Sequence, residues 1–230
     1  MTRLLDILLS GLALLILSPL LVPLAIALRL SGEGEVFLVQ KRVGKGGGDF
    51  GLYKFATMLK DSPNIGTGTV TLKDDPRILP LGHFLRRTKI NELPQLLNIF
   101  LGDMSLIGPR PQTRRCFNAF PLQSQQAITT LRPGLSGIGS IVFRGEDKML
   151  DGATDPDHLY DHVIMPYKGE LEEWYVPRQG VATYLLLIFL TAWVVLFPGS
   201  SAVWRAFPDL PTPPDELKAY INDPRQASNG

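Results

Sequence analysis

The chain has 230 residues, enough for one domain with a substantial core, and 45% of them are hydrophobic. This share and the positive mean hydropathy favour contact with a membrane. A formal net charge of +1 provides no strongly basic field, so no nucleic-acid partner is expected. The single cysteine, Cys116, cannot form an internal disulfide, which suits a reducing compartment.

Residues 1–31 contain an apolar stretch of about 27 residues, roughly 40 Å of straight helix and longer than a hydrocarbon core of about 30 Å. Pro19 lacks an amide donor and predicts a kink at Ser18-Pro19, where the Ser18 hydroxyl can help satisfy the freed carbonyls. Arg3 and Arg29 flank both ends, so the positive charges do not orient the segment. The residues alone leave two alternatives open: a re-entrant helix-break-helix with both ends cytoplasmic, and a kinked transmembrane helix.

From residue 32 to residue 180 the composition is that of a globular domain. Residues 36–40 read as a strand, and residues 50–55 as its returning partner after a glycine-rich loop. No GK[ST] sequence closes this loop, so a hairpin turn is favoured over a phosphate-binding loop. Lys54 lies between two aromatic residues in the second strand.

Two helices are predicted after the hairpin and after an acidic, glycine-rich loop at residues 60–76. The first covers residues 81–90 and carries Arg86. The second covers residues 91–100, because its apolar residues follow the period of a buried amphipathic helix. Asn91 is expected to cap it, with Pro94 in the first turn and Gly102 as the stop.

Three arginines beside proline or glycine are candidate phosphate ligands. Arg110 lies between two prolines, which would present its guanidinium rigidly for bidentate phosphate binding. Arg132 precedes Pro133-Gly134, and Arg144 lies in an Ile-Val-Phe-Arg-Gly turn. A structural arginine in a stiff turn is the alternative for Arg110.

A second apolar segment and a polar tail end the chain. Residues 181–199 predict a helix in the membrane interface, because the apolar run is short for a span and is flanked by aromatic residues. A full span is the alternative. Residues 200–230, rich in proline and charge, are predicted to be an extended tail.

These pieces together resemble the bacterial sugar transferase family, the monotopic phosphoglycosyl transferases, over about residues 1 to 175. The resemblance rests on the Ser18-Pro19 break and on five sequence blocks in the family's order: Gln40-Lys41-Arg42-Val43-Gly44, Tyr53 to Met58, Leu85-Arg86 with Asn91 to Gln95, Gly102 to Ser105 with Gly108 to Pro111, and Arg132-Pro133-Gly134. It implies a mainly α protein with a small β-hairpin (α+β), anchored by a re-entrant helix and carrying a cytoplasmic catalytic domain.

The implied activity moves a sugar 1-phosphate from a UDP-sugar to polyprenyl (undecaprenyl) phosphate and releases UMP. This is the first membrane step of O-antigen, capsule or exopolysaccharide assembly. The expected location is the cytoplasmic face of the bacterial inner membrane, with membrane lipid as a further partner. A homodimer is left open.

The resemblance also implies the site. Its catalytic pair, an Asp-Glu dyad at a helix start, falls here on Asn91-Glu92, and Mg²⁺ bound at Glu92 would offset phosphate charge. The positions of Lys54, Arg86 and Arg110 would hold phosphates. Arg132, Arg144 and Asp161 are further substrate-binding candidates, Asp161 because it follows a tyrosine as in the family's Tyr-Asp step.

Residue 91 departs from the family pattern, because a neutral amide is not a competent nucleophile toward phosphorus. Three alternatives are open. Glu92 itself attacks; or Glu92 or Asp103 binds magnesium or acts as a base while the lipid phosphate attacks directly; or the chain is an inactive relative that acts as a membrane scaffold or binds lipid and nucleotide.

Overall fold

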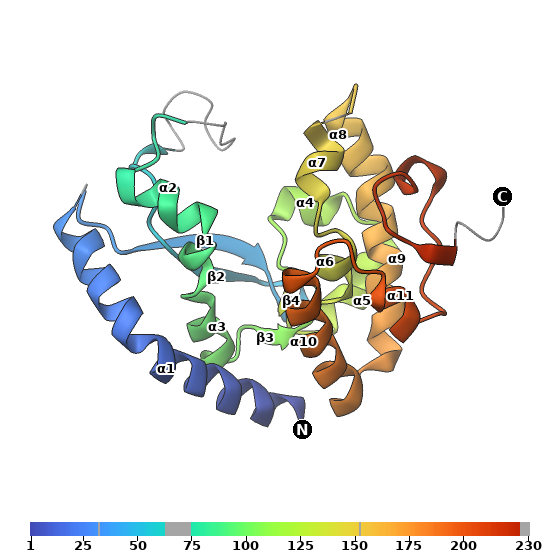
Figure 1. Ribbon diagram of the computed structural model, residues 1–230, viewed down its shortest axis with the longest axis horizontal. Helices are drawn as coiled ribbons and strands as arrows, with labels where there is room; N and C mark the ends of the chain where they lie inside the picture. The colour runs from blue at the N-terminus through green and yellow to red at the C-terminus, as the bar shows by residue number, and fades with distance from the viewer. Residues whose placement is uncertain (32, 63–74, 152, 226–230) are drawn as a thin grey trace. The chain divides into compact units, whose positions relative to one another are not determined.

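The computed structural model describes residues 1–31, 33–62, 75–151 and 153–225. Most of the loop expected at residues 60–76 therefore lies outside the described residues. The chain, drawn as a ribbon in Figure 1, divides into two compact units. The N-terminal unit comprises Leu5–Lys41 and Gly51–Gly102; the C-terminal unit comprises Met1–Leu4, Arg42–Phe50 and Asp103–Gly230.

The predicted hairpin is confirmed, and with it the mainly α fold with a small sheet. Strands β1 (Phe37–Val43) and β2 (Asp49–Phe55) pair in a two-stranded sheet. A 3₁₀ turn over Lys45–Gly47 joins them. Gly46 and Gly47 have φ values of 77° and 78°, which side-chain-bearing residues rarely adopt, so the glycines of this loop are needed for the turn.

The N-terminal apolar segment forms one helix, α1 (Thr2–Leu30), which contains both Pro19 and Pro23. The helix continues through Ser18-Pro19, so a kink there does not interrupt it (Figure 1), and the re-entrant arrangement stays a prediction. Ser18 acts as expected: its hydroxyl donates to the Leu15 carbonyl at 2.8 Å. Such bonding, together with solvation of the remaining carbonyls, lets a helix tolerate internal prolines.

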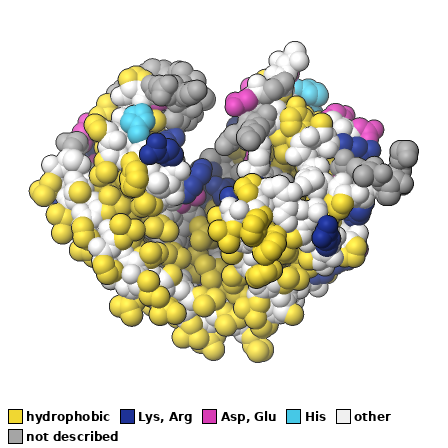
Figure 2. All heavy atoms as spheres, in the orientation of Figure 1, with side chains coloured by type: hydrophobic (Ala, Val, Ile, Leu, Met, Phe, Trp, Pro, Cys, Tyr) yellow, Lys and Arg dark blue, Asp and Glu magenta, His cyan; other side chains and the backbone are white. Residues whose placement is uncertain are grey.

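One side of α1 packs on the N-terminal unit, and the rest is exposed. Leu28 is buried with Phe55 and Leu85 in a core cluster. The helix is long and apolar enough to cross a membrane by length and composition, and only 6% of its most apolar window is buried. Figure 2 shows hydrophobic side chains over the surface of this helix. The exposed large side chains include Leu4, Leu8, Leu12, Leu15, Ile16, Val22 and Ile26.

The helix predicted from residue 91 begins later. After α2 (Pro80–Arg87), Lys89 adopts a left-handed φ of 61°, and a 3₁₀ turn covers Ile90–Glu92. Helix α3 spans Gln95–Leu101 and starts directly after a proline, so Asn91 does not cap it. The expected stop is confirmed: Gly102 has a φ of 107° and donates its amide to the Asn98 carbonyl.

The C-terminal unit is a set of short helices around a minimal parallel sheet. Strands β3 and β4 pair through Ser105 with Gly134 and through Ile107 with Ser136. Helix α9 packs against α5 and α6, while α10 packs against α6 and β3. The elements are β3 (Ser105–Ile107), α4 (Arg114–Asn118), α5 (Leu122–Thr129), β4 (Gly134–Ser136), α6 (Ile138–Val142), α7 (Glu146–Asp151), α8 (Pro156–Leu159), a π-helical turn (Tyr160–Ile164), α9 (Met165–Tyr175), a 3₁₀ turn (Val176–Arg178), α10 (Val181–Leu196), α11 (Ala202–Ala206) and a 3₁₀ turn (Asp215–Leu217).

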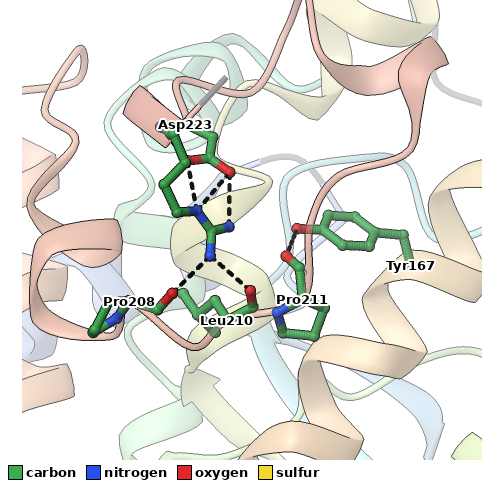
Figure 3. Close-up of polar contacts among 6 residues, drawn as sticks. Tyr167, Pro208, Leu210, Pro211 and Asp223 are labelled. Atoms are coloured by element: carbon green, nitrogen blue, oxygen red, sulfur yellow. Dashed lines mark hydrogen bonds and ion pairs between the residues drawn. The ribbon is translucent and has the colours of Figure 1, made fainter. Parts of the chain in front are cut away.

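The expectation of an extended tail does not hold for residues 200–225. The Arg225 guanidinium donates to the Asp223 carboxylate and to the carbonyls of Pro208 and Leu210 (Figure 3). The Tyr167 hydroxyl on α9 donates to the Pro211 carbonyl at 2.8 Å. Buried apolar residues such as Trp204, Leu210, Leu217 and Ile221 anchor the segment. The composition did not predict this packing, because the buried apolar residues are spaced irregularly among prolines and charged residues.

Candidate functional site

In the N-terminal unit, the structure brings Lys54 and Glu92 together. Lys54 lies on β2 and Glu92 in the 3₁₀ turn before α3, and their Nζ and Oε1 atoms are 3.0 Å apart. The side chains are 17% and 21% exposed, so the pair is partly screened from water yet open to a ligand. The sequence placed both residues in the site but did not predict that they contact each other.

Asn98 holds β2 beside α3 and so positions this pair. Its side chain accepts from the Tyr53 amide at 2.9 Å and donates to the Gly51 carbonyl at 2.7 Å. Asn98 is fully buried, so these bonds form away from competing water. The register of the strand against the helix is thereby fixed, with Lys54 one residue after the bonded amide.

Asn91 and Arg86 lie in the same unit. The Asn91 Oδ1 is buried and accepts no hydrogen bond from the residues that the structure describes. An unsatisfied buried acceptor costs about 1–3 kcal/mol, and the left-handed Lys89 adds further strain just before the turn. Arg86 is half-buried in the last turn of α2. Backbone strain and unsatisfied buried groups, such as those at Lys89 and Asn91, are often found at functional sites.

In the C-terminal unit, glycine-to-glycine backbone contact positions the turn that carries Arg110. The Gly108 amide donates to Ser136, and the Gly134 amide donates to the Pro109 carbonyl at 2.7 Å. A Cβ at Gly134 would lie 2.2 Å from the Gly108 nitrogen. The arginine turn therefore depends on close approach of two backbone segments, which the prolines and glycines of the sequence allow.

The other predicted residues of this unit are spread over several elements. Asp103 is exposed before β3, Arg132 is half-buried before β4, and Arg144 is exposed after α6. Asp161 lies on the π-helical turn, where its Oδ2 accepts from Arg115 at 3.2 Å. Its Oδ1 is buried without a hydrogen-bond partner among the described residues. Turns of this kind often occur at functional sites.

The sequence missed two buried ionisable residues on α9, Lys168 and Glu172. They are 7% and 4% exposed. Burial raises the pKa of Glu172 to about 8, against the opposing effects of the Gly139 amide and Lys168. Burial lowers the pKa of Lys168, while Glu146 opposes that shift. Their spacing of four residues would place both side chains on the same face of a helix, but charged neighbours such as Glu170 and Glu173 hid the fact that this face is buried.

We expect Glu172→Gln to stabilise the protein near pH 8. The native carboxyl keeps its proton up to about pH 8, whereas the unfolded chain releases it near pH 4.5. The stability contributed by that proton is complete below pH 4.5 and is lost as the pH rises to about 8, by up to about 1.4 kcal/mol per unit. Thermal unfolding in detergent between pH 4.5 and 8 should show this slope flattened in the variant. An unchanged slope would contradict the assignment.

Glu92 is the residue at which the family resemblance implies magnesium. Within the described ranges, no group of three or more His, Cys, Asp or Glu side chains could hold a metal ion. Mg²⁺ often uses only one or two carboxylates together with substrate phosphates and water. Glu92 supplies one such carboxylate, so the residues fit magnesium only as an ion held jointly with a phosphorylated substrate.

Comparison with known proteins identifies the family of this chain. The family model described as Bacterial sugar transferase matches residues 1–198. The UDP-glucose:undecaprenyl-phosphate glucose-1-phosphate transferase of Escherichia coli (strain K12) is 36% identical over 194 residues, which cover 81% of this chain and 38% of that protein. The UDP-N-acetylgalactosamine-undecaprenyl-phosphate N-acetylgalactosaminephosphotransferase of Aeromonas hydrophila is 39% identical over 141 residues, 60% of this chain and 33% of that protein.

A shorter relative is the exopolysaccharide production protein ExoY of Rhizobium meliloti (strain 1021). It is 34% identical over 157 residues, covering 61% of this chain and 68% of the relative. The chain thus spans between 33% and 38% of the length of the two larger relatives. Because the family model covers more than four-fifths of its residues, this chain belongs to the bacterial sugar transferase family.

Proposed function

We propose that this chain transfers a sugar 1-phosphate from a UDP-sugar to undecaprenyl phosphate, releasing UMP, as the first membrane step of glycan assembly. The observation that carries the proposal is the family match over residues 1–198, joined by relatives named for this transfer. The partly buried Lys54–Glu92 pair supports it, because it provides a carboxylate and an ammonium of the kind that phosphoryl transfer requires.

In the reaction, an oxygen nucleophile attacks the phosphorus that carries the sugar, and the bond from that phosphorus to UMP breaks. Glu92 is the catalytic carboxylate: either it attacks phosphorus itself, or it binds magnesium or acts as a base while the lipid phosphate attacks directly. Asp103 is the alternative for this second role. Lys54, Arg86, Arg110, Arg132 and Arg144 hold phosphate oxygens, with Asp161 as a further substrate contact. Glu92, together with substrate phosphates, would hold Mg²⁺, which would offset the phosphate charge when bound.

The membrane arrangement is part of the proposal. α1 anchors the chain from the cytoplasmic face and re-enters on that side, with its prolines permitting a bend in lipid. Support comes from its exposed apolar surface and from the arginines near both ends, Arg3 and Arg29. A cysteine label placed beside each arginine should react from the same side of sealed vesicles. Opposite sides would show a transmembrane helix.

α10 lies in the membrane interface. Its 16 residues make about 24 Å of helix, short of a 30 Å hydrocarbon core, and one face is buried against protein through Tyr184, Leu187, Leu190 and Val194. The opposite face exposes apolar and aromatic side chains, among them Leu185, Phe189, Trp193 and Leu196. We also expect a homodimer. The mass of the detergent-solubilised protein would test this expectation.

The test is UMP release from a panel of UDP-sugars, including UDP-glucose and UDP-N-acetylgalactosamine, with undecaprenyl phosphate and Mg²⁺. We expect one sugar to be turned over well above the others. The competing function is a noncatalytic membrane scaffold, favoured by Asn91 at the position of the family's nucleophile. A chain that releases no UMP and is not stabilised by any UDP-sugar would support the scaffold instead.

A further inference from the structure

Two of the three histidines of the chain lie together on the surface of the C-terminal unit. His158 is on α8, and His162 is on the π-helical turn that follows and leads into α9. Their ring centres are 4.5 Å apart, and the ring planes differ by 18°. Both residues are exposed, so this stretch of helix presents two neighbouring imidazole rings to solvent.

A backbone contact determines which nitrogen of His162 is available to a ligand. The His162 Nδ1 lies 3.3 Å from the His158 carbonyl oxygen. A carbonyl oxygen only accepts hydrogen bonds, so Nδ1 carries the proton in this contact and the neutral ring has its lone pair on Nε2. A histidine that binds a metal through one ring nitrogen usually donates the other N–H to such an acceptor, which orients the ring. His162 therefore has the hydrogen bond typical of a metal-binding histidine.

The spacing of the two rings suits a shared metal ion. Two imidazole nitrogens on a tetrahedral zinc ion, each about 2.0–2.1 Å from the metal, lie about 3.3 Å apart. Exposed side chains whose ring centres are 4.5 Å apart can reach that spacing by rotating about their side-chain bonds. The separation of four residues along the chain is also the one at which two histidines of a helix bind zinc together.

The acidic residues around the pair have other partners. Asp155 accepts from the His158 amide at 3.0 Å and so caps α8. Asp157 and Asp161 lie 3.7 Å and 3.2 Å from the Arg115 guanidinium. Within the described parts of the chain, no third His, Cys, Asp or Glu joins the histidines in a metal-binding group. The two imidazoles are therefore the protein ligands on offer, and water would fill the remaining positions around an ion.

We propose that His158 and His162 together bind one divalent transition-metal ion through a ring nitrogen of each. Zn²⁺, Ni²⁺ and Cu²⁺ are the ions that fit, because imidazole binds them well, whereas Mg²⁺ prefers oxygen ligands. The bound ion joins α8 to the π-helical turn and stabilises this stretch of helix. The site does not depend on the sugar-phosphate transfer proposed above, and it takes a different class of ion from the one expected at Glu92.

The test is zinc binding by the full chain, purified in detergent without a histidine tag and titrated in a calorimeter. The wild type should bind one Zn²⁺ per chain. His158→Gln and His162→Gln should each weaken binding at least about tenfold, the smallest loss usually seen when even an outer-shell partner of a metal is removed. His83→Gln is the matched control, because His83 is the third histidine and is exposed on α2, and it should bind zinc as the wild type does.

Two further measurements make the test specific. Cys116→Ser removes the single thiol, which is half-buried on α4, and should leave zinc binding unchanged. Zn²⁺ should raise the thermal unfolding midpoint of the wild type but not that of His158→Gln, and an equal concentration of Mg²⁺ should not displace it. The inference would be overturned by a wild type that binds no zinc, by full binding in either His158→Gln or His162→Gln, or by loss of binding in His83→Gln or Cys116→Ser.

Discussion

Replacing Glu92 by glutamine is expected to reduce UMP release about a thousandfold, the effect typical of losing an essential catalytic carboxylate. The amide has the same shape but neither attacks phosphorus nor accepts a proton efficiently. Glu92 is the carboxylate that the structure pairs with Lys54 at 3.0 Å, and residue 91 beside it is a neutral asparagine. UMP release by purified protein with UDP-sugar and undecaprenyl phosphate measures the effect.

Two controls separate chemistry from folding. Glu216→Gln makes the same change at an exposed position in the tail and should leave activity unchanged. The thermal midpoint of Glu92→Gln should remain within a few degrees of the wild type, because the glutamine oxygen can still accept the hydrogen bond from Lys54. A folded variant that keeps full activity would show that Glu92 is not the catalytic carboxylate.

The role of Glu92 can be resolved further by omitting the lipid acceptor. UMP released in an amount equal to the protein, without undecaprenyl phosphate, would indicate that Glu92 forms a covalent phosphosugar intermediate. Strict dependence on the acceptor would indicate direct displacement by the lipid phosphate. Asn91→Asp restores the family's pair and is the reference for the first outcome.

The sequence predicted features that depend on local chemistry. The glycines of the β1–β2 turn and the stop at Gly102 require positive φ values, which glycine supplies at no steric cost. The start of α3 was misplaced because Asn91 is a good cap in isolation, whereas the left-handed Lys89 produces a separate 3₁₀ turn. Local preference does not determine where a chain is strained by its surroundings.

Features that depend on contacts between distant parts of the chain could not be predicted from the sequence, for a different reason. β3 and β4 have three residues each, too few to show a period, and they are joined by about 26 intervening residues. The burial of Lys168 and Glu172 depends on α6, which packs against α9 only in the folded unit. Candidate ligands such as Arg110 could be named from their sequence neighbours, but the backbone contacts that position them, such as that between Gly108 and Gly134, could not.

Gly134→Ala is expected to destabilise the C-terminal unit by about 3 kcal/mol or more, beyond the usual cost of overpacking. The added Cβ would lie 2.2 Å from the Gly108 nitrogen and 2.4 Å from the carbonyl oxygens of Gly108 and Ser136. All three atoms are backbone, so no side chain can rotate away, and the two strands must separate. The turn that carries Arg110 would move with them, and UMP release should fall together with the thermal midpoint.

Gly48→Ala is the matched control for this substitution. Gly48 has a φ of −73°, and a Cβ there would meet no atom within 4 Å. Alanine should therefore be neutral or slightly stabilising, because it reduces the freedom of the unfolded chain. Equal midpoints for the two variants would show that β3 and β4 do not approach as closely as the structure places them. A loss confined to Gly134→Ala would tie the position of Arg110 to this contact between two glycines.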